Sequence, residues 1–299
     1  MAAAYIAAFP TRLDGIGECE SCLRWAVLAV SGKISLEQAR NADAAKLAEI
    51  SKRAFNSDVS VGAPTSGKDG APSEGGGPPG YDSPEFQVRM MRFCRYYKMI
   101  YDGRIVGGLI ASQRRPGHCE LERIFVAPEY HNRGIGTEAM NQVFAMFPDA
   151  KIWTLGTPEW NVRTKHFYEK LGFVQIGWTK DEPEWNGRYY EKLVDSNQRY
   201  EHMKISALAP GMRGVEVEAK VLEVSGPRQV HSRTTGEPLR VAEAVIGDKT
   251  GTIKLALWND QISQVRINDK IRINNGYVTS FRGQKQLSIG RYGPLVILL

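Results

Sequence analysis

The sequence predicts two domains, an α/β domain with a mixed, mainly antiparallel sheet followed by an all-β barrel of five strands. Its 299 residues suffice for two domains of ordinary size. Strand-like alternation and helix-like periodicity take turns in the first two thirds, whereas only strand patterns recur afterwards. We therefore expect an N-terminal extension over residues 1–33, an α/β domain over 34–194, a polar linker over 195–202 and a barrel over 203–299.

The first domain begins with elements that its hydrophobic spacing and turn residues predict. Asp102-Gly103 separates two β-rich runs and suits a left-handed hairpin turn. The run from 56 to 84 is rich in Gly, Pro and Ser and is expected to be a mobile loop. In order we expect a strand over 34–40, a helix over 44–55, that loop, a helix over 85–92, strands over 96–101, 104–113 and 120–127, a helix over 137–147, a strand over 152–155, a helix over 163–171, and antiparallel strands over 173–178 and 188–193.

The last third alternates apolar and polar residues with period two, as half-buried strands do. Turn residues at 247–251 and at Arg282-Gly283 separate the runs. The predicted strands span 214–224, 239–246, 252–258, 269–281 and 284–289, with a short helix over 261–265. Five strands within a domain of this length indicate a small barrel.

Composition excludes several classes of protein. The chain is 42% hydrophobic and 24% charged, as globular proteins are, and has no apolar run near the ~20 residues of a membrane span. Its start lacks the basic and long apolar regions of a signal peptide. Cys19 and Cys22 have ligand spacing, but no second pair completes a zinc site, so we expect reduced thiols, no metal and a cytoplasmic location.

The net charge of +6 is unevenly distributed. Residues 203–299 hold six Lys and eight Arg against three Asp and five Glu, while the remainder is neutral. A basic barrel beside a neutral domain suggests an anionic partner for the barrel. A solvated basic face without a partner is the alternative reading.

Arg133-Gly-Ile-Gly136 joins a predicted strand to a predicted helix. Gly134 and Gly136 let the backbone approach a ligand closely, and the free N–H groups at a helix N-terminus attract anions. The motif therefore indicates a site for the phosphate of a nucleotide-like cofactor. A tight strand-to-helix connection is the structural alternative.

Further along the chain stand Trp160-Asn161 and the run from His166 to Phe173. Together with the glycine motif, this series resembles the GNAT superfamily of acetyl-CoA-dependent N-acetyltransferases, over roughly residues 34–194. In that family the loop usually opens with Gln or Arg where this chain has His131. The loop works mainly through backbone N–H groups, so the departure is small.

The resemblance implies acetyl-CoA as co-substrate and a role for several residues. Tyr168 stands where the family has its general acid, which protonates the sulfur of CoA. The residues implied in cofactor binding are Ile124, Phe125 and Val126 by their backbone, His131, Arg133, Gly134, Ile135, Gly136 and Thr137 in the loop, and Asn161 and Tyr168 beyond it.

The general base and the acceptor site are less sharply indicated. Glu120 and Glu122 lie two apart on one strand face, and Glu120 has the place of the base in several family members. Salt bridges with neighbouring arginines are an equally good account of both glutamates. For the acceptor amine we expect contacts with Tyr81 and Asp82 in the Gly/Pro-rich loop and with Tyr189 on the last strand.

The C-terminal run resembles the OB-fold single-stranded-DNA-binding proteins of archaea over nearly all of residues 203–299. The resemblance rests on Gly-Asp-Lys-Thr-Gly at 247–251, Leu-Ala-Leu-Trp at 255–258 and the run 276–287. It implies that Trp258, Tyr277 and Phe281 stack on bases, worth ~1–3 kcal/mol per base. Basic residues expected beside them, for phosphates, are Arg228, Arg233, Arg240, Lys254, Arg282 and Lys285.

Two functions fit these patterns. The first is an acetyl-CoA-dependent N-acetyltransferase, acting on a protein or small amine, tethered to a module for single-stranded DNA or RNA. The second is a single-stranded DNA-binding protein whose GNAT-like domain is structural or senses CoA. The acceptor, the choice between DNA and RNA, the oligomeric state and the coupling of the domains are left open by the sequence.

Overall fold

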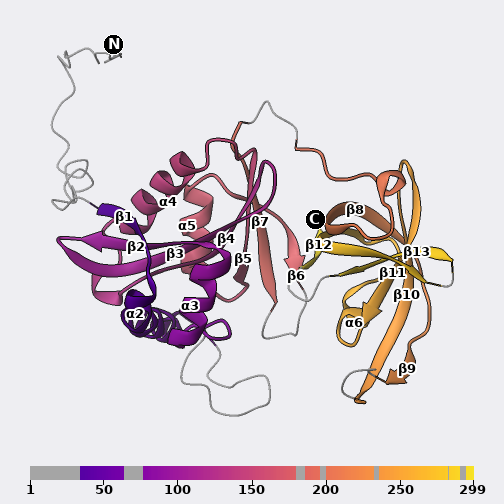
Figure 1. Ribbon diagram of the computed structural model, residues 1–299, viewed down its shortest axis with the longest axis horizontal. Helices are drawn as coiled ribbons and strands as arrows, with labels where there is room; N and C mark the ends of the chain where they lie inside the picture. The colour runs from indigo at the N-terminus through magenta and orange to yellow at the C-terminus, as the bar shows by residue number, and fades with distance from the viewer. Residues whose placement is uncertain are drawn as a thin grey trace, which may run out of the picture.

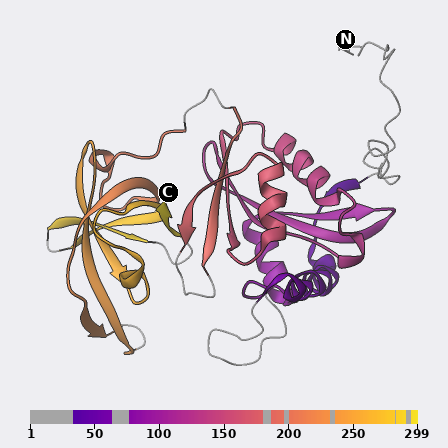
Figure 2. The ribbon, with the colours of Figure 1, turned by 180° about the vertical axis from the view of Figure 1, so that it is seen from behind.

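The computed structural model describes residues 34–63, 77–179, 186–195, 200–231, 236–281, 283–289 and 294–299. The proposed extension over 1–33, and with it Cys19 and Cys22, lies outside the described residues, as does most of the expected mobile loop. Figure 1 shows two lobes, each with its own sheet region, and Figure 2 shows them from behind. Among the described residues no helix has both the length and the apolar character needed to cross a bilayer.

The first lobe is a twisted sheet covered by helices on both faces. Helices α4 and α5 lie on one face and α2 and α3 on the other (Figures 1 and 2). Its elements are β1 (Ile34–Gln38), α2 (Ala44–Asn56), α3 (Pro84–Phe93), β2 (Arg95–Tyr101), β3 (Arg104–Arg115), β4 (His118–Val126), α4 (Ile135–Met146), β5 (Ile152–Pro158), α5 (Val162–Lys170), β6 (Val174–Thr179) and β7 (Gly187–Leu193), with short 3-10 turns η1 (Asn41–Asp43), η2 (Ser57–Val61) and η3 (Pro128–Tyr130).

The order of strands in this sheet is β1-β2-β3-β4-β5-β7-β6. Every neighbouring pair is antiparallel except β4 and β5, which are parallel. Asp102 and Gly103 both adopt positive φ, 49° and 72°, in the tight turn between β2 and β3. The predicted α/β lobe with a mixed, mainly antiparallel sheet is thus confirmed.

The second lobe is a barrel closed by the pairings β8-β10-β11-β13-β12-β8. Among the described strands of this lobe, only β11 and β13 run parallel. Its elements are η4 (Ile205–Ala207), β8 (Arg213–Val224), β9 (Arg228–His231), β10 (Pro238–Asp248), β11 (Gly251–Trp258), α6 (Gln261–Gln264), β12 (Lys270–Phe281), β13 (Gln284–Ile289) and β14 (Leu295–Leu298). The predicted five-stranded barrel is confirmed, and β9 and β14 are additions that the sequence did not predict.

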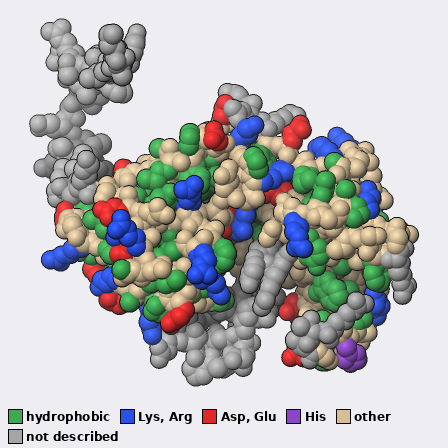
Figure 3. All heavy atoms as spheres, in the orientation of Figure 1, with side chains coloured by type: hydrophobic (Ala, Val, Ile, Leu, Met, Phe, Trp, Pro, Cys, Tyr) green, Lys and Arg blue, Asp and Glu red, His purple; other side chains and the backbone are tan. Residues whose placement is uncertain are grey.

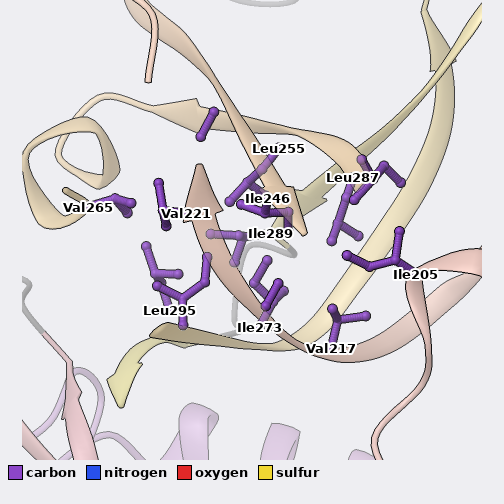
Figure 4. Packing of buried hydrophobic residues seen from close by; sticks show 14 of the residues in the cluster. Ile205, Val217, Val221, Ile246, Leu255, Val265, Ile273, Leu287, Ile289 and Leu295 are labelled. Carbon is purple, nitrogen blue, oxygen red and sulfur yellow. The ribbon is translucent and has the colours of Figure 1, made fainter. Parts of the chain in front are cut away.

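The inward faces of the barrel strands supply its core. Figure 4 shows Val217, Val221, Ile246, Leu255 and other side chains filling the interior. Because strand side chains alternate, the neighbours of these residues on each strand point outward. On β8 and the first half of β12, the outward side chains face the first lobe.

The two lobes share one continuous sheet. Strand β14 pairs with β12 of the barrel and, on its other side, with β6 of the first lobe. Gly177 allows this junction, because a Cβ atom there would lie 2.3 Å from the carbonyl oxygen of Ile297. The lobes abut in the space-filling view of Figure 3.

Candidate functional site

Strands β4 and β5 open into a wedge. They pair only at His118 with Ile152, Cys119 with Trp153 and Glu120 with Thr154. Beyond that point β4 keeps its partner β3 as far as Val126, and β5 keeps its partner β7 as far as Pro158, but β4 and β5 no longer pair with each other. Among the described strands, β4 therefore has no partner on its β5 side from Leu121 onward. Its backbone groups there, which include the predicted Ile124, Phe125 and Val126, are available to an extended ligand.

Helix α4 begins at the end of β4 with the predicted glycine motif. Gly134 is its N-cap residue at φ 76°, and no side chain caps the helix. The first N–H groups of a helix have no intrahelical partner, and here they belong to Ile135, Gly136 and Thr137. Ile135 is buried and anchors the turn. The arrangement fits a phosphate group, because bare N–H groups and the positive end of the helix dipole meet at one place.

His131 fastens this loop to the strand before it. Its Nε2 atom donates to the carbonyl oxygen of Val126 at 2.7 Å, so its Nδ1 atom is left to accept from Arg163 at 3.3 Å. Burial lowers the pKa of His131, so the neutral ring that these bonds require is favoured. Arg133 is exposed and lies over the Tyr130 ring at 5.2 Å.

Asn161 connects helix α5 to η2, the 3-10 turn that follows α2. Its Oδ1 atom accepts from the backbone N–H of Thr164 at 3.1 Å, which caps α5, and its Nδ2 atom donates to Asp58 at 3.1 Å. Asp58 also pairs with Arg163 and is buried. Burial raises the pKa of Asp58 despite these partners. Sequence reasoning missed Asp58, because its partners lie more than 100 residues away and no motif marks it.

Tyr168, the predicted acid, lies on α5 and is buried to 6% exposure. Phe167, Phe173 and Tyr190 surround its ring at 5.1, 6.0 and 6.2 Å between centroids. Burial, and then the negative charge of Asp58, raise the pKa of Tyr168 well above its usual value. The phenol is therefore protonated at neutral pH, as a proton donor must be.

Glu120 and Glu122 are held by one arginine. The Nε atom of Arg114 donates to Glu120 at 2.5 Å, and its Nη2 atom lies 2.8 Å from Glu122. Ser112 also donates to Glu122 at 2.5 Å. Burial, and next the charge of Glu122, raise the pKa of Glu120, while Arg114 opposes them. The salt bridges expected as the alternative account of these glutamates are present. Glu120 nevertheless keeps a raised pKa because of its burial, and a carboxylate with a raised pKa is a candidate base.

The three residues expected at the acceptor have different environments. The hydroxyl of Tyr81 donates to Asn56 at 2.8 Å, and Asp82 is exposed beside it. Tyr189 is fully buried, and its hydroxyl accepts from the side chain of Asn274 in the barrel at 2.6 Å. Tyr189 thus faces the second lobe rather than the Tyr81 loop.

The predicted aromatic residues of the barrel share one outward face. In register, Tyr277 of β12 is opposite Ser288 of β13, which is opposite Ala256 of β11, and Trp258 follows two residues later on β11. Phe281 lies four residues beyond Tyr277, so it faces the same way. Trp258 and Phe281 are 37% and 43% exposed. Ala256 and Ser288, which lie between them in register, are small and only 3% and 5% exposed, so the exposed parts of this face are the rings themselves.

The predicted basic residues border this face to different extents. Arg228 and Arg240 are exposed on the neighbouring strands β9 and β10. Lys254 pairs with Glu243 at 3.3 Å, and Lys285 donates to the carbonyl oxygen of Leu208 at 3.0 Å. Arg233 and Arg282 lie outside the described residues. In the view of Figure 3, blue basic groups are spread over both lobes among hydrophobic ones.

Comparison with known families matches both lobes. Residues 72–173 match the acetyltransferase (GNAT) family, and residues 208–296 match the OB fold of Ssb-like single-stranded DNA-binding proteins. The chain therefore combines a GNAT acetyltransferase domain with a C-terminal Ssb-like OB fold, as the sequence predicted. Below, these are called the GNAT domain and the OB domain.

Individual relatives each resemble one part of the chain. The single-stranded DNA-binding protein Ssb of Saccharolobus solfataricus is 37% identical over 87 residues, 29% of this chain and 57% of that protein. An uncharacterized N-acetyltransferase of Mycobacterium bovis is 34% identical over 76 residues, 24% of this chain and 48% of its own. The chain thus spans about half the length of these curated relatives.

Among solved structures, the PaiA N-acetyltransferase of Thermoplasma acidophilum in complex with coenzyme A aligns with 54% of this chain and 99% of its own. The identity is 16% and the TM-score 0.42.

Proposed function

We propose that this chain is an acetyl-CoA-dependent N-acetyltransferase whose OB domain binds single-stranded nucleic acid. Three observations support the proposal: β4 has an unpaired edge where β5 diverges, α4 begins with N–H groups that no side chain caps, and Tyr168 of α5 is a buried, protonated phenol. The membership of residues 72–173 in the GNAT family supports it. An intracellular location beside nucleic acid belongs to the same proposal.

The reaction requires a binding site, a base and an acid. The first N–H groups of α4 hold the pyrophosphate of acetyl-CoA, and the free edge of β4 holds its pantetheine arm. Glu120 takes a proton from the acceptor amine, directly or through water, and the nitrogen attacks the thioester carbonyl. Tyr168 donates its phenolic proton to the sulfur as the carbon–sulfur bond breaks. The products are an acetylated amine and free CoA.

The OB domain supplies the second activity. Aromatic rings on one outward face accept any base by stacking, and exposed arginines at the border attract phosphate. This favours single strands over duplex, in which the bases are already stacked. The match of residues 208–296 to Ssb-like proteins supports this part of the proposal.

The test is release of free CoA thiol by the full chain with acetyl-CoA and each of three amines: spermidine, a short lysine peptide with a blocked N-terminus, and a short peptide with a free N-terminal alanine. We expect turnover with at least one amine. Tyr168→Phe should lower kcat by about 10²-fold or more, because it loses the acid but keeps the ring. Phe167→Leu, which alters packing nearby, serves as the control for structural damage.

Turnover by Tyr168→Phe equal to that of the unchanged chain would refute the role of the acid. Binding of acetyl-CoA without turnover on any amine would favour the alternative function, a nucleic-acid-binding protein whose GNAT domain senses CoA.

A further inference from the structure

Charged and polar side chains are buried where the OB domain meets the GNAT domain. Glu216 on β8 points out of the barrel, yet it is only 1% exposed. His118 of β4 contacts it, and Tyr200 and Arg115 bond to it at 2.8 Å each. A buried carboxylate is stable only with such partners, so this contact requires both domains.

A second cluster lies beside the first. Arg272 of β12 is 5% exposed and bonds to Glu218 of the barrel at 2.5 Å and to Glu191 of β7 at 2.6 Å. Both clusters lie on the outward faces of β8 and of the first half of β12. The aromatic residues proposed to stack on bases lie on the second half of β12 and on β11. The OB domain therefore uses different surfaces for the GNAT domain and for nucleic acid.

A line of buried side chains runs from one of these clusters through the GNAT sheet and back to the OB domain. The path leads by hydrogen bonds from Glu216 to His118 and from the Nε2 atom of His118 to Thr154 at 2.7 Å, then across from β5 to Tyr189 on the paired strand β7, which bonds to Asn274 at 2.6 Å. Each of these five residues is at most 2% exposed. Without the OB domain, both ends of the path would be lost.

Two residues of this path, His118 and Thr154, are neighbours of the candidate base Glu120. Glu120 is two residues beyond His118 on β4 and pairs in register with Thr154. The negative charge of Glu120 also raises the pKa of Tyr189, so the two side chains are electrostatic neighbours. The OB domain thus covers the side of the sheet on which Glu120 lies, opposite to α4 and α5.

We propose that the OB domain completes the acetyl-transfer site and that Asn274 is a positioning residue, which acts through Tyr189 on the environment of Glu120. This inference rests on the proposed acetyltransferase function. It makes the OB domain more than a tether, because a residue of the barrel holds a residue next to the base. A nucleic-acid strand on the aromatic face is then held in a fixed relation to the acceptor site.

The test uses the full chain and the amine that it acetylates fastest among the three probes. Asn274→Leu keeps the size of the side chain and removes its bond to Tyr189, and it also removes an Oδ1 atom that has no partner in the described structure. Tyr189→Phe removes the other partner of the same bond. Each variant should lower kcat by about tenfold, with the KM for acetyl-CoA unchanged.

The double variant Asn274→Leu with Tyr189→Phe should be no slower than Tyr189→Phe alone, because the two residues act through one bond. Lys270→Ala, an exposed change on the same strand, is the control. Affinity for oligo-dT should be unchanged in all variants, which shows that the barrel is folded.

Two results overturn the inference while leaving the acetyltransferase function intact. One is unchanged kcat in Asn274→Leu, and the other is an effect of the double variant equal to the product of the single effects. A chain that acetylates none of the three amines overturns the inference together with the proposed function.

Discussion

Arg114 sets the electrostatics of the candidate base. It forms salt bridges with buried Glu120 at 2.5 Å and with half-buried Glu122 at 2.8 Å. Those carboxylates in turn raise the pKa of Arg114 against the effect of burial, so it stays charged at any working pH. The pKa of Glu120 is therefore a balance between burial and Glu122, which raise it, and Arg114, which lowers it.

Replacing Arg114 by glutamine should shift the pH dependence of acetyl transfer. A base acts in its deprotonated form, so activity falls as pH drops through its pKa. Loss of the arginine removes the force that lowers the pKa of Glu120, so the acidic limb of kcat/KM should move to higher pH. The measurement is kcat/KM for the amine from pH 5 to 9, with Arg53→Gln, an exposed ion pair on α2, as control. An unmoved acidic limb would mean that another group is the base.

Single residues show how far sequence reasoning reached. The glycine loop was singled out as a motif, and Tyr168 and Glu120 by their positions in the resemblance to the GNAT family; their roles stay predictions. Asp58 and His118 were missed as parts of the site. Their partners are 103 residues away for Asp58 and 98 for His118, and such pairs form only when the chain folds.

At the level of elements, the aromatic face depends on strand register. A shift of β12 by one residue would turn Tyr277 and Phe281 into the core and Val278 outward, so burial of Val278 and its neighbours fixes the register. The same alternation that builds the core therefore places the rings on the outward face of the barrel.

The combined substitution of Trp258, Tyr277 and Phe281 by alanine should abolish measurable affinity for oligo-dT. Loss of ~1–3 kcal/mol per stacked base predicts a fall of at least a hundredfold for three rings. Fluorescence anisotropy at several salt concentrations measures it, and the unchanged chain should lose affinity steeply with salt. Phe93→Ala on α3, an exposed aromatic residue of the GNAT domain, is the control. Retained affinity in the triple variant would place the strand on another surface.

Most elements were predicted from the sequence within a few residues. The exceptions are informative: β9 is a short strand that exists by pairing with β10, and β14 is an apolar run whose two partners lie in different domains. Neither has a local pattern that separates it from a loop or a core segment. Whether these two segments form strands depends on which edges of the neighbouring strands are left unpaired once the other elements have folded.

At the level of the whole molecule, the GNAT and OB domains form one body. The shared strand β14 and the two buried polar clusters connect them, and residues 200 and 202 of the expected linker take part by bonding to Glu216 and Glu218. The hydrogen bond from His202, and next the charge of Arg272, lower the pKa of Glu218 to about 2. Contacts of this kind favour joint unfolding over independent unfolding.

Gly177→Ala should separate the unfolding of the two domains. The added Cβ atom would clash with the backbone of β14, so the β6–β14 pairing must open while each domain keeps its own core. Calorimetry should show one transition for the unchanged chain and two for the variant. Gly103→Ala, at positive φ in a hairpin with open space around it, controls for the cost of replacing a glycine. One transition in both would show that the junction contributes little.

The amino-acid sequence alone was enough to predict the two folds, which the structure confirms, and to single out the glycine loop, Tyr168 and the barrel aromatics as candidate site residues. These depend on local periodicity, turn chemistry and short motifs, which a linear chain displays directly. Only the tertiary structure decided that Tyr189 faces the barrel, that His118 and Glu216 meet, and that the OB domain covers the side of the sheet that carries Glu120. Such contacts join residues far apart in the chain, and burial and pairing in three dimensions select them.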